Sequence, residues 1–150
     1  MLGDKMYVGG KSIDNTGSRI IDFLFKKDLL DSVVLIEIKT PTTPLVGPKY
    51  RDNAYSISTD LTGTINQVLA YKEGLTREYA TIALNSEKQF GVFNPRTIVI
   101  AGSLEDEKLT KAQKKSFEMF RCDLRNVEII TFDELFDRIK HIIDLVQGIK

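Results

Sequence analysis

The sequence predicts an α/β domain in which a mixed β-sheet is flanked by helices. Strand-like segments rich in β-branched and aliphatic residues come first, and the second half of the chain alternates strand, helix, strand and helix. This alternation requires at least one parallel crossover within the sheet. The chain has 150 residues, of which 42% are hydrophobic and 28% are charged, which is typical of one soluble domain with its own core.

The first half of the chain predicts a β-hairpin. A short strand is expected around residues 6–8. Residues 19–25 and 33–40 are rich in strand-forming side chains, and the segment 26–32 separates them as a hairpin connection would. Two adjacent antiparallel strands are therefore predicted. The next segment, up to about Tyr55, is predicted to be an irregular loop or a frayed third strand, because it contains four residues that interrupt regular structure: Pro41, Pro44, Gly47 and Pro48.

Helical and buried-strand patterns follow. Helices are predicted at about 60–73, 104–120 and 132–146, and buried strands at 97–101 and 127–131. Gly74 stands where the C-terminal cap of the first helix belongs, and residues 77–94 show little pattern. The inward side of the middle helix is predicted to hold Leu109, Ala112, Phe117 and Phe120. The apolar side of the last helix is predicted to hold Leu135, Ile139, Ile142, Ile143 and Val146.

No apolar run predicts a membrane span. The longest runs, 33–36 and 98–101, are far shorter than the ~20 residues that a span needs, and no secretory signal opens the chain. We therefore expect a cytoplasmic protein without a membrane partner. The single cysteine, Cys122, cannot form an internal disulfide and is predicted to be reduced and partly buried. The single histidine, His141, is predicted to be a surface residue of the last helix.

The formal net charge is zero, so DNA binding would have to rely on local basic patches. Three candidates are present. They are Lys26 with Lys27, Lys49 with Arg51, and the group Lys108, Lys111, Lys114 and Lys115. Taken one at a time, each patch is more simply explained as ordinary solvated charge.

The strongest chemical signal is the charged pair Glu37 and Lys39, late in an otherwise apolar strand. Strand geometry puts these two side chains on one face, about 6.6 to 6.8 Å apart. If the hairpin is centred between residues 29 and 30, Asp22 lies directly opposite Glu37. Directly opposed residues have β-carbons about 4.5 to 5.5 Å apart, so two unshielded carboxylates would repel each other. A Mg²⁺ ion removes this conflict by accepting one oxygen from each carboxylate while it keeps waters for chemistry.

Lys39 extends this constellation. Its ammonium group can point at a phosphate oxygen or at an attacking water, which suits metal-assisted hydrolysis of a phosphodiester. In the structural alternative, Asp22 and Lys39 form a cross-strand ion pair and Glu37 is an exposed strand residue. The three-residue pattern alone favours that alternative, and the opposed Asp22 tips the balance toward a metal site.

The predicted helix after the hairpin adds a polar stripe. At 100° per residue, one flank of the helix carries Asp60, Thr64, Gln67 and Tyr71. In a buried groove Gln67 could hold the attacking water or a phosphate, and Tyr71 could hydrogen-bond or stack on DNA. The alternative is a solvated helix flank.

The order of these motifs resembles the nuclease domain of the Shedu anti-phage defence proteins, a branch of the PD-(D/E)XK nucleases. The matching motifs are Gly9-Gly10-Lys11, Asp22-Phe23-Leu24, Glu37-Ile38-Lys39-Thr40-Pro41, Tyr50-Arg51, and Gln67 with Tyr71. The resemblance spans nearly the whole chain. Its most specific part is the Glu-x-Lys-Thr-Pro strand end followed by Gln-x-x-x-Tyr, a pairing also seen in RecB-like nucleases.

The resemblance implies a restriction-endonuclease-like fold for residues 1–150 and a metal-dependent DNA endonuclease activity. It implies a catalytic set of Asp22, Glu37, Lys39 and Gln67. The implied ligands of Mg²⁺ or Mn²⁺ are Asp22, Glu37 and the backbone carbonyl of Ile38, and the implied DNA contacts are Lys11, Lys49, Arg51 and Tyr71. A homo-oligomer is expected. Because too few residues precede Arg19 for the helix that usually opens this fold, we also expect a fragment of a longer protein that lacks an N-terminal regulatory region.

Two alternatives remain open at the level of sequence. A DNA repair nuclease of the RecB-like or junction-resolving type would use the same residues on another substrate. A catalytically inactive DNA-binding or oligomerisation module would keep the fold without the chemistry, and the intact set of four catalytic candidates argues against it.

Overall fold

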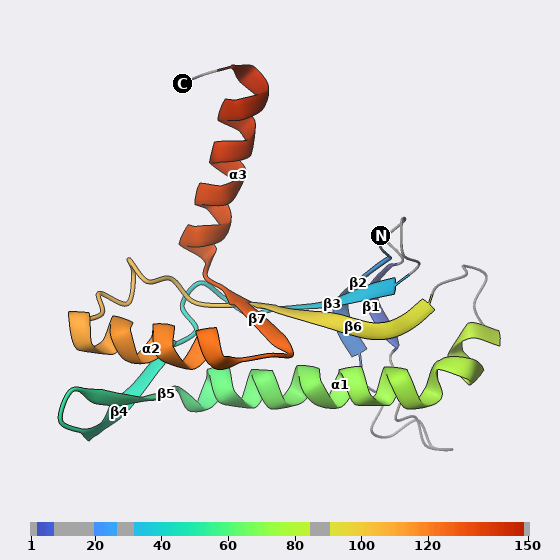
Figure 1. The fold of residues 1–150 in the computed structure, drawn as a ribbon, viewed down its shortest axis with the longest axis horizontal. Helices are drawn as coiled ribbons and strands as arrows, with labels where there is room; N and C mark the ends of the chain where they lie inside the picture. Colours follow the sequence, from blue (N-terminus) through green and yellow to red (C-terminus); the bar gives the residue numbers. More distant parts are fainter. Residues whose placement is uncertain (1–2, 8–19, 27–31, 85–90, 149–150) are drawn as a thin grey trace. The chain divides into compact units, whose positions relative to one another are not determined.

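The computed structural model describes residues 3–7, 20–26, 32–84 and 91–148, and it confirms the α/β class (Figure 1). In chain order the elements are β1 Gly3–Tyr7, β2 Ile20–Lys26, β3 Ser32–Ile38, β4 Val46–Arg51, β5 Ala54–Ile57, α1 Thr59–Leu84, β6 Gly91–Ile100, α2 Lys111–Asp123, β7 Val127–Ile130 and α3 Phe132–Gln147. Five of the described strands form one sheet in the order β1-β2-β3-β6-β7, and β4 pairs with β5 separately.

The five-stranded sheet is mixed, as predicted. Strands β1, β2 and β3 pair in antiparallel fashion. The Lys39 N–H donates a hydrogen bond to the Ile100 carbonyl over 2.9 Å. The Ala101 N–H donates to the Ile130 carbonyl over 3.2 Å. These bonds join the carboxyl ends of β3, β6 and β7, so the three strands run parallel to one another. A mixed sheet flanked by helices fits the restriction-endonuclease-like fold.

The chain divides into two compact units. The first comprises Met1–Ile38, Gly63–Val99 and Leu124–Glu128, and the second comprises Lys39–Thr62, Ile100–Asp123 and Ile129–Lys150. None of the described helices is both long enough and apolar enough to cross a lipid bilayer.

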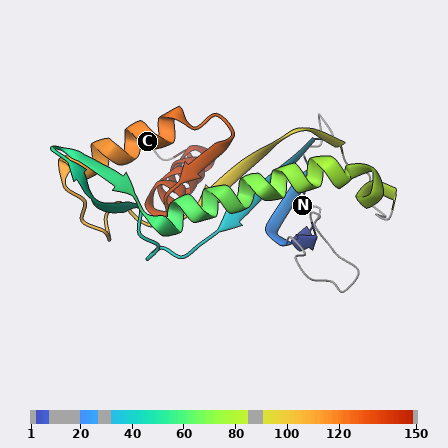
Figure 2. The same ribbon diagram turned by 90° about the horizontal axis from the view of Figure 1, so that it is seen from below.

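In the first unit, α1 runs along one face of the sheet (Figure 1 and Figure 2). On β3 one face carries Val33, Leu35 and Glu37, which are all buried, and the other face is covered in part, since Val34 is buried and Ile36 is half-buried. The buried apolar side chains of this unit include Ile21, Leu24, Val33, Leu35, Ile65, Val68, Leu75 and Val99. Full burial stabilises the fold by about 1.5 to 3 kcal/mol for each large apolar side chain. The buried side chains of β2 and β3 therefore hold these two strands in one register.

In the second unit, the β4–β5 hairpin packs against α2. The Tyr55 N–H donates to the Ser116 Oγ over 3.1 Å. The Glu107 carboxylate accepts the N–H groups of Leu45 and Val46 over 2.9 and 3.2 Å. Phe117 on α2 is fully buried. The hairpin is therefore held by both apolar packing and main-chain hydrogen bonds.

This hairpin corrects the prediction of an irregular loop or a frayed third strand. Pro48 lies inside β4, and the β4–β5 register shifts between Val46 and Lys49. Proline is tolerated at a bulge or on an edge strand, because its missing N–H is not needed for the ladder there. Asn53 makes the turn with a φ of 55°, a conformation that asparagine adopts more readily than most residues.

The first predicted helix is too short. Helix α1 continues ten residues beyond the predicted cap at Gly74, to Leu84, and Gly74 is buried inside it. A glycine within a helix costs only about 1 kcal/mol relative to alanine, and the burial of Leu75 directly after it offsets that cost. Strand β6 begins at Gly91 and not at Thr97.

The predicted start of the middle helix at residue 104 is also wrong, since α2 begins at Lys111. Residues 104–108 form turns, in which the Ser103 Oγ accepts the Asp106 N–H over 3.1 Å. Thr110 then caps α2, because its Oγ1 accepts the Gln113 N–H over 3.4 Å. The inward side chains of this helix follow the prediction in part, since Phe117 is buried and Ala112 and Phe120 are half-buried. Leu109 is buried but precedes the helix.

Helix α3 has nearly the predicted bounds but an unexpected environment. No residue of α3 is buried. Figure 1 shows α3 leaving the end of β7 and running away from α2. Its exposed large apolar side chains are Phe136, Ile139, Ile142, Ile143, Leu145 and Val146. The apolar stripe predicted from the sequence is therefore formed, but it faces solvent.

Cys122 is exposed and not partly buried as predicted. It follows the buried Phe117 by five residues on α2, which turns it to the outer side of the helix. His141 is exposed on α3, as predicted, with its Nδ1 2.9 Å from the Asp137 carbonyl oxygen.

Candidate functional site

The register of β2 and β3 agrees with the sequence prediction. Phe23 is paired with Ile36, and Leu24 is paired with Leu35. Continued by one residue, this register sets Asp22 opposite Glu37. The side chains of Leu24 and Leu35 are buried on the face that Asp22 and Glu37 share.

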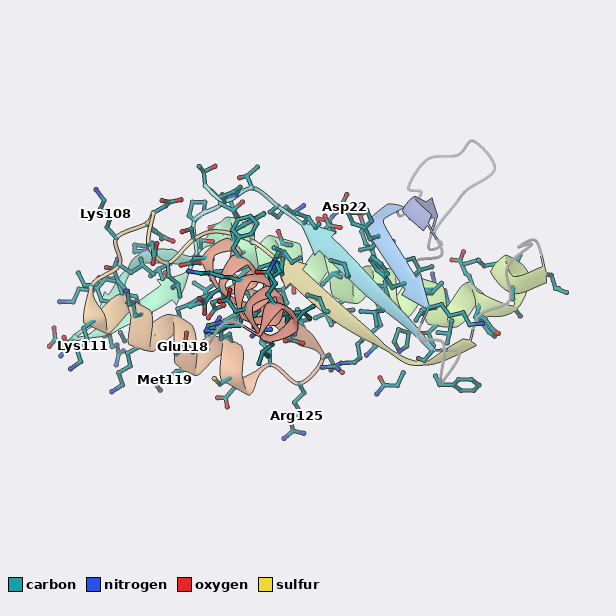
Figure 3. The ribbon with its side chains drawn as sticks, turned by 90° about the horizontal axis from the view of Figure 1, so that it is seen from above. Asp22, Lys108, Lys111, Glu118, Met119 and Arg125 are labelled. Atoms are coloured by element: carbon teal, nitrogen blue, oxygen red, sulfur yellow. The ribbon has the colours of Figure 1, made fainter. Side chains whose placement is uncertain are left out.

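Asp22, a residue of β2, lies beside the carboxyl end of β3. Its Oδ2 accepts a hydrogen bond from the Ile38 N–H over 2.9 Å, and Figure 3 shows its side chain beside the end of that strand. Asp22 is half-buried, and only 5% of Glu37 is exposed. The alternative in which Glu37 is an exposed strand residue is therefore wrong. A buried carboxylate opposite a second carboxylate is a pair of acceptors that a divalent cation suits.

The oxygens gathered here suit a hard divalent cation. Asp22 and Glu37 supply carboxylates, and the Ile38 carbonyl is a third oxygen at the same strand end. No group of three or more His, Cys, Asp or Glu side chains that could hold a metal occurs in the described part of the chain. Mg²⁺ does not need such a group, because it is commonly bound by one or two carboxylates together with waters and substrate phosphates. The donor set thus fits Mg²⁺ or Mn²⁺ and does not resemble a zinc site.

Lys39 is the first residue of the second unit, two positions after Glu37. It is half-buried, and its backbone N–H is held by the Ile100 carbonyl. That its side chain shares the face of Glu37 is a prediction from the sequence, which rests on the two-residue period of a strand.

Gln67 and Tyr71 form a hydrogen-bonded pair on α1. The Gln67 Nε2 donates to the Tyr71 hydroxyl over 2.6 Å, and both side chains are half-buried. Thr64 on the same stripe is only 4% exposed. This part of the stripe is not a fully solvated flank. The bond orients the Gln67 side chain toward the Tyr71 hydroxyl.

Lys72, next to this pair, was not among the residues predicted from the sequence. Its Nζ lies 3.0 Å from the Asn94 Oδ1 and 3.4 Å from the Asn126 Oδ1. Partial burial lowers the pKa of Lys72 below its ordinary value. Lys72 thereby ties α1 to β6 and to the turn before β7. No local pattern could have revealed the tie, because its three members are far apart in sequence.

Two of the predicted DNA contacts lie on the β4–β5 hairpin of the second unit. Lys49 and Arg51 are both exposed. The Lys49 Nζ is 3.4 Å from the Asp52 Oδ1, and the Arg51 guanidinium lies 5.5 Å from the ring centre of Tyr50. Lys11 falls outside the described residues.

A second charged group, also not predicted from the sequence, joins α2 to α3. The Arg121 Nη1 and Nη2 donate to the two oxygens of Glu134 over 2.7 and 2.5 Å. Arg121 also contacts Glu118 at 2.6 Å, and the Thr131 N–H donates to Glu134 over 3.1 Å. The hydrogen bonds from Arg121 lower the pKa of Glu134 to about 2. This clamp fixes the start of α3 against the end of α2.

We expect acid to weaken the clamp. The pKa of Glu134 is lower in the folded chain than its ordinary value of 4.5, so its stabilising contribution is complete above pH 4.5 and is lost as the pH falls toward about 2. Glu134→Gln should lower the free energy of unfolding by about 2 kcal/mol at neutral pH, between the values for exposed and buried pairs. The free energy of unfolding is measured by urea unfolding, followed by circular dichroism, at pH 7, 4 and 3. The difference in this free energy between the wild type and Glu134→Gln should become smaller as the pH falls. Glu118→Gln is the matched control, with an expected loss below about 1 kcal/mol because Glu118 is more exposed. A difference in unfolding free energy that stays constant down to pH 3 would contradict the stabilising role of the ionised Glu134.

Comparison with known proteins shows the family of the chain. Residues 4–136 match the family described as Shedu protein SduA, C-terminal. The chain belongs to the Shedu family. It is also 45% identical over 154 aligned residues to the Shedu protein SduA of Bacillus cereus (strain B4264). That alignment covers 99% of the chain and 40% of the relative, so the chain spans about two fifths of the length of this curated Shedu protein.

Proposed function

We propose that this Shedu-family chain is the catalytic part of a metal-dependent DNA endonuclease that acts in the cytoplasm in anti-phage defence. The observation that carries the proposal is the carboxylate pair at the end of β3. Glu37 is 5% exposed, and Asp22 is bonded to the N–H of the residue that follows Glu37. Two carboxylates in this register suit a divalent cation, and a divalent cation suits hydrolysis of a phosphodiester.

Each residue of the set has a distinct task in this proposal. Asp22, Glu37 and the Ile38 carbonyl would hold Mg²⁺ or Mn²⁺, which lowers the pKa of a bound water and offsets negative charge on the phosphate. Lys39 adds a positive charge where the phosphate becomes more negative in the transition state. Gln67, oriented by Tyr71, positions the attacking water or a phosphate oxygen. Lys11, Lys49, Arg51 and Tyr71 contact the DNA.

A cleavage assay tests this function directly. The purified chain is incubated with supercoiled and linear DNA in Mg²⁺, in Mn²⁺ and in EDTA, and the products are separated on a gel. We expect nicking or linearisation that depends on the divalent cation. Selective cleavage of branched DNA would instead favour the repair nuclease. DNA binding without cleavage in either metal would favour the inactive module.

The proposal includes assembly of several copies through α3. Phe132, Leu135, Ile139, Ile142 and Val146 are spaced by three, four, three and four residues, which is the spacing of a coiled-coil seam. None of these five side chains is buried in the described structure, and Ile142 is 60% exposed. An apolar seam of this kind on a charged helix is self-complementary, so a second copy is the occupant that it fits.

A further inference from the structure

Helix α2 carries lysines on its outer side. At about 100° per residue, Lys111, Lys114 and Lys115 fall within about 100° of one another around the helix. All three are exposed. The other side of α2 is occupied, because Ser116 contacts β5 and Phe117 is fully buried. These lysines, together with Lys108 just before the helix, are termed the lysine face, and Figure 3 shows Lys108 and Lys111 at the start of α2.

Acidic neighbours do not neutralise the lysine face. In the described part of the chain, no ion pair involves any of its four lysines. Glu118 lies on the same side of α2 but is bound to Arg121 at 2.6 Å. Glu107, which precedes Lys108, is turned to the N–H groups of Leu45 and Val46. The chain is neutral as a whole, so this positive charge is separated from the acids that balance it.

Lys111 is also placed where it weakens the helix. The first turn of α2 contains no acidic residue and begins with Lys111. The amino end of a helix is the positive end of its dipole, and acidic side chains there stabilise a helix whereas basic ones destabilise it. Stability of α2 therefore does not explain Lys111, whereas binding of a polyanion does.

We propose that the lysine face binds the phosphate backbone of duplex DNA and holds the substrate of the nuclease proposed above, on which this inference rests. Lysines are flexible point charges that suit phosphates, and contacts to phosphate alone carry no sequence information. The β4–β5 hairpin packs on the same helix through β5 within the second unit, and it carries the exposed Arg51 as a further cation, whereas Lys49 is paired with Asp52. DNA binding through this face is thus independent of base sequence.

The triple variant K111E/K114E/K115E tests the proposal. Binding of the full chain to a fluorescein-labelled duplex is followed by fluorescence anisotropy in EDTA, so that no turnover occurs. We expect at least a tenfold loss of affinity at moderate salt, and a slope of log K against log salt that is smaller by about 2 to 3, because each phosphate contact contributes about 0.9. The melting temperature should be unchanged or higher, since the new acids favour the amino end of the helix. Unchanged affinity and slope would overturn the proposal.

Single charge reversals provide a matched control. Lys114→Glu and Lys140→Glu make the same charge change at exposed positions of α2 and α3. Only Lys114→Glu should weaken DNA binding by severalfold and reduce the salt slope by about 0.9. An equal loss in both variants would show a general charge effect and would overturn the assignment to this face. The assignment would also be overturned if the triple variant lost binding to poly-glutamate but kept its affinity for DNA, because the lysine face would then fit an acidic protein.

Cys122 gives an independent readout. It is the one cysteine of the chain and is exposed on the outer side of α2, seven residues after Lys115. DNA should slow its reaction with a thiol reagent severalfold in the wild-type chain and not in the triple variant. An unaffected rate in the wild type would contradict the binding of DNA on this face.

Because both readouts are taken without turnover, they also separate the lysine-face proposal from the nuclease proposal. Cleavage by a triple variant with normal DNA affinity rejects the lysine face and keeps the nuclease. If the wild-type chain cleaves no DNA but the triple variant has lost DNA affinity, DNA binding by the lysine face is supported and the nuclease is rejected.

Discussion

Replacing Glu37 by glutamine should abolish DNA cleavage, whereas replacing Lys39 by alanine should leave metal binding intact and lower the turnover rate by a factor of about 10² or more. Glu37→Gln keeps the size of a side chain that is 5% exposed but removes the charge of the proposed metal ligand. Lys39→Ala leaves both carboxylates in place and removes only the ammonium that we propose acts on phosphate and water. The two defects should therefore differ in kind.

Calorimetric titration with Mg²⁺ or Mn²⁺ and a gel assay on plasmid DNA separate the two defects. The affinity for the metal should be lowered by Glu37→Gln and unchanged by Lys39→Ala. Glu73→Gln, an exposed carboxylate on α1 of the first unit, is the matched control and should behave like the wild type. If Lys39→Ala folds normally and cleaves at the wild-type rate, Lys39 is not catalytic, and an ion pair between Asp22 and Lys39 becomes the better explanation.

Two lysines placed in the seam of α3 should convert an assembled form of the chain into a monomer. Ile139 and Ile142 are 44% and 60% exposed, so lysine at either position is tolerated within one chain. In a paired seam the same lysines would bury charge against apolar side chains. We expect the dissociation constant of the assembly to rise by a factor of about 10² or more in the double variant Ile139→Lys/Ile142→Lys.

Sedimentation across a range of protein concentrations measures this change. His141→Lys is the matched control, because His141 lies on the polar side of α3 next to Asp137 and should leave the assembly unchanged. The proposal of assembly through α3 fails if the wild-type chain is monomeric at every concentration. It also fails if the double variant assembles as the wild type does.

The placement of Asp22 opposite Glu37 could be predicted from the sequence once the hairpin is centred between residues 29 and 30. The two-residue period of a strand then defines which residues share a face, and a one-residue slip would move the buried Leu24 and Leu35 to the opposite side. The hairpin register could therefore be predicted and is observed. The bounds of β7 and α3 were predictable for the same reason, since strong local periodicity extends over each whole element.

Tertiary packing decided what local patterns could not. Helix α1 continues past Gly74 because buried contacts outweigh a weak local stop signal, and Pro48 joins β4 because its strand lies in a small separate sheet that accepts a bulge. The burial of Glu37, the clamp between Arg121 and Glu134, and the exposure of the α3 seam are likewise absent from any sequence pattern. Periodicity reports which side chains share a face, and only the folded chain determines what lies opposite that face: apolar core, a partner charge or water.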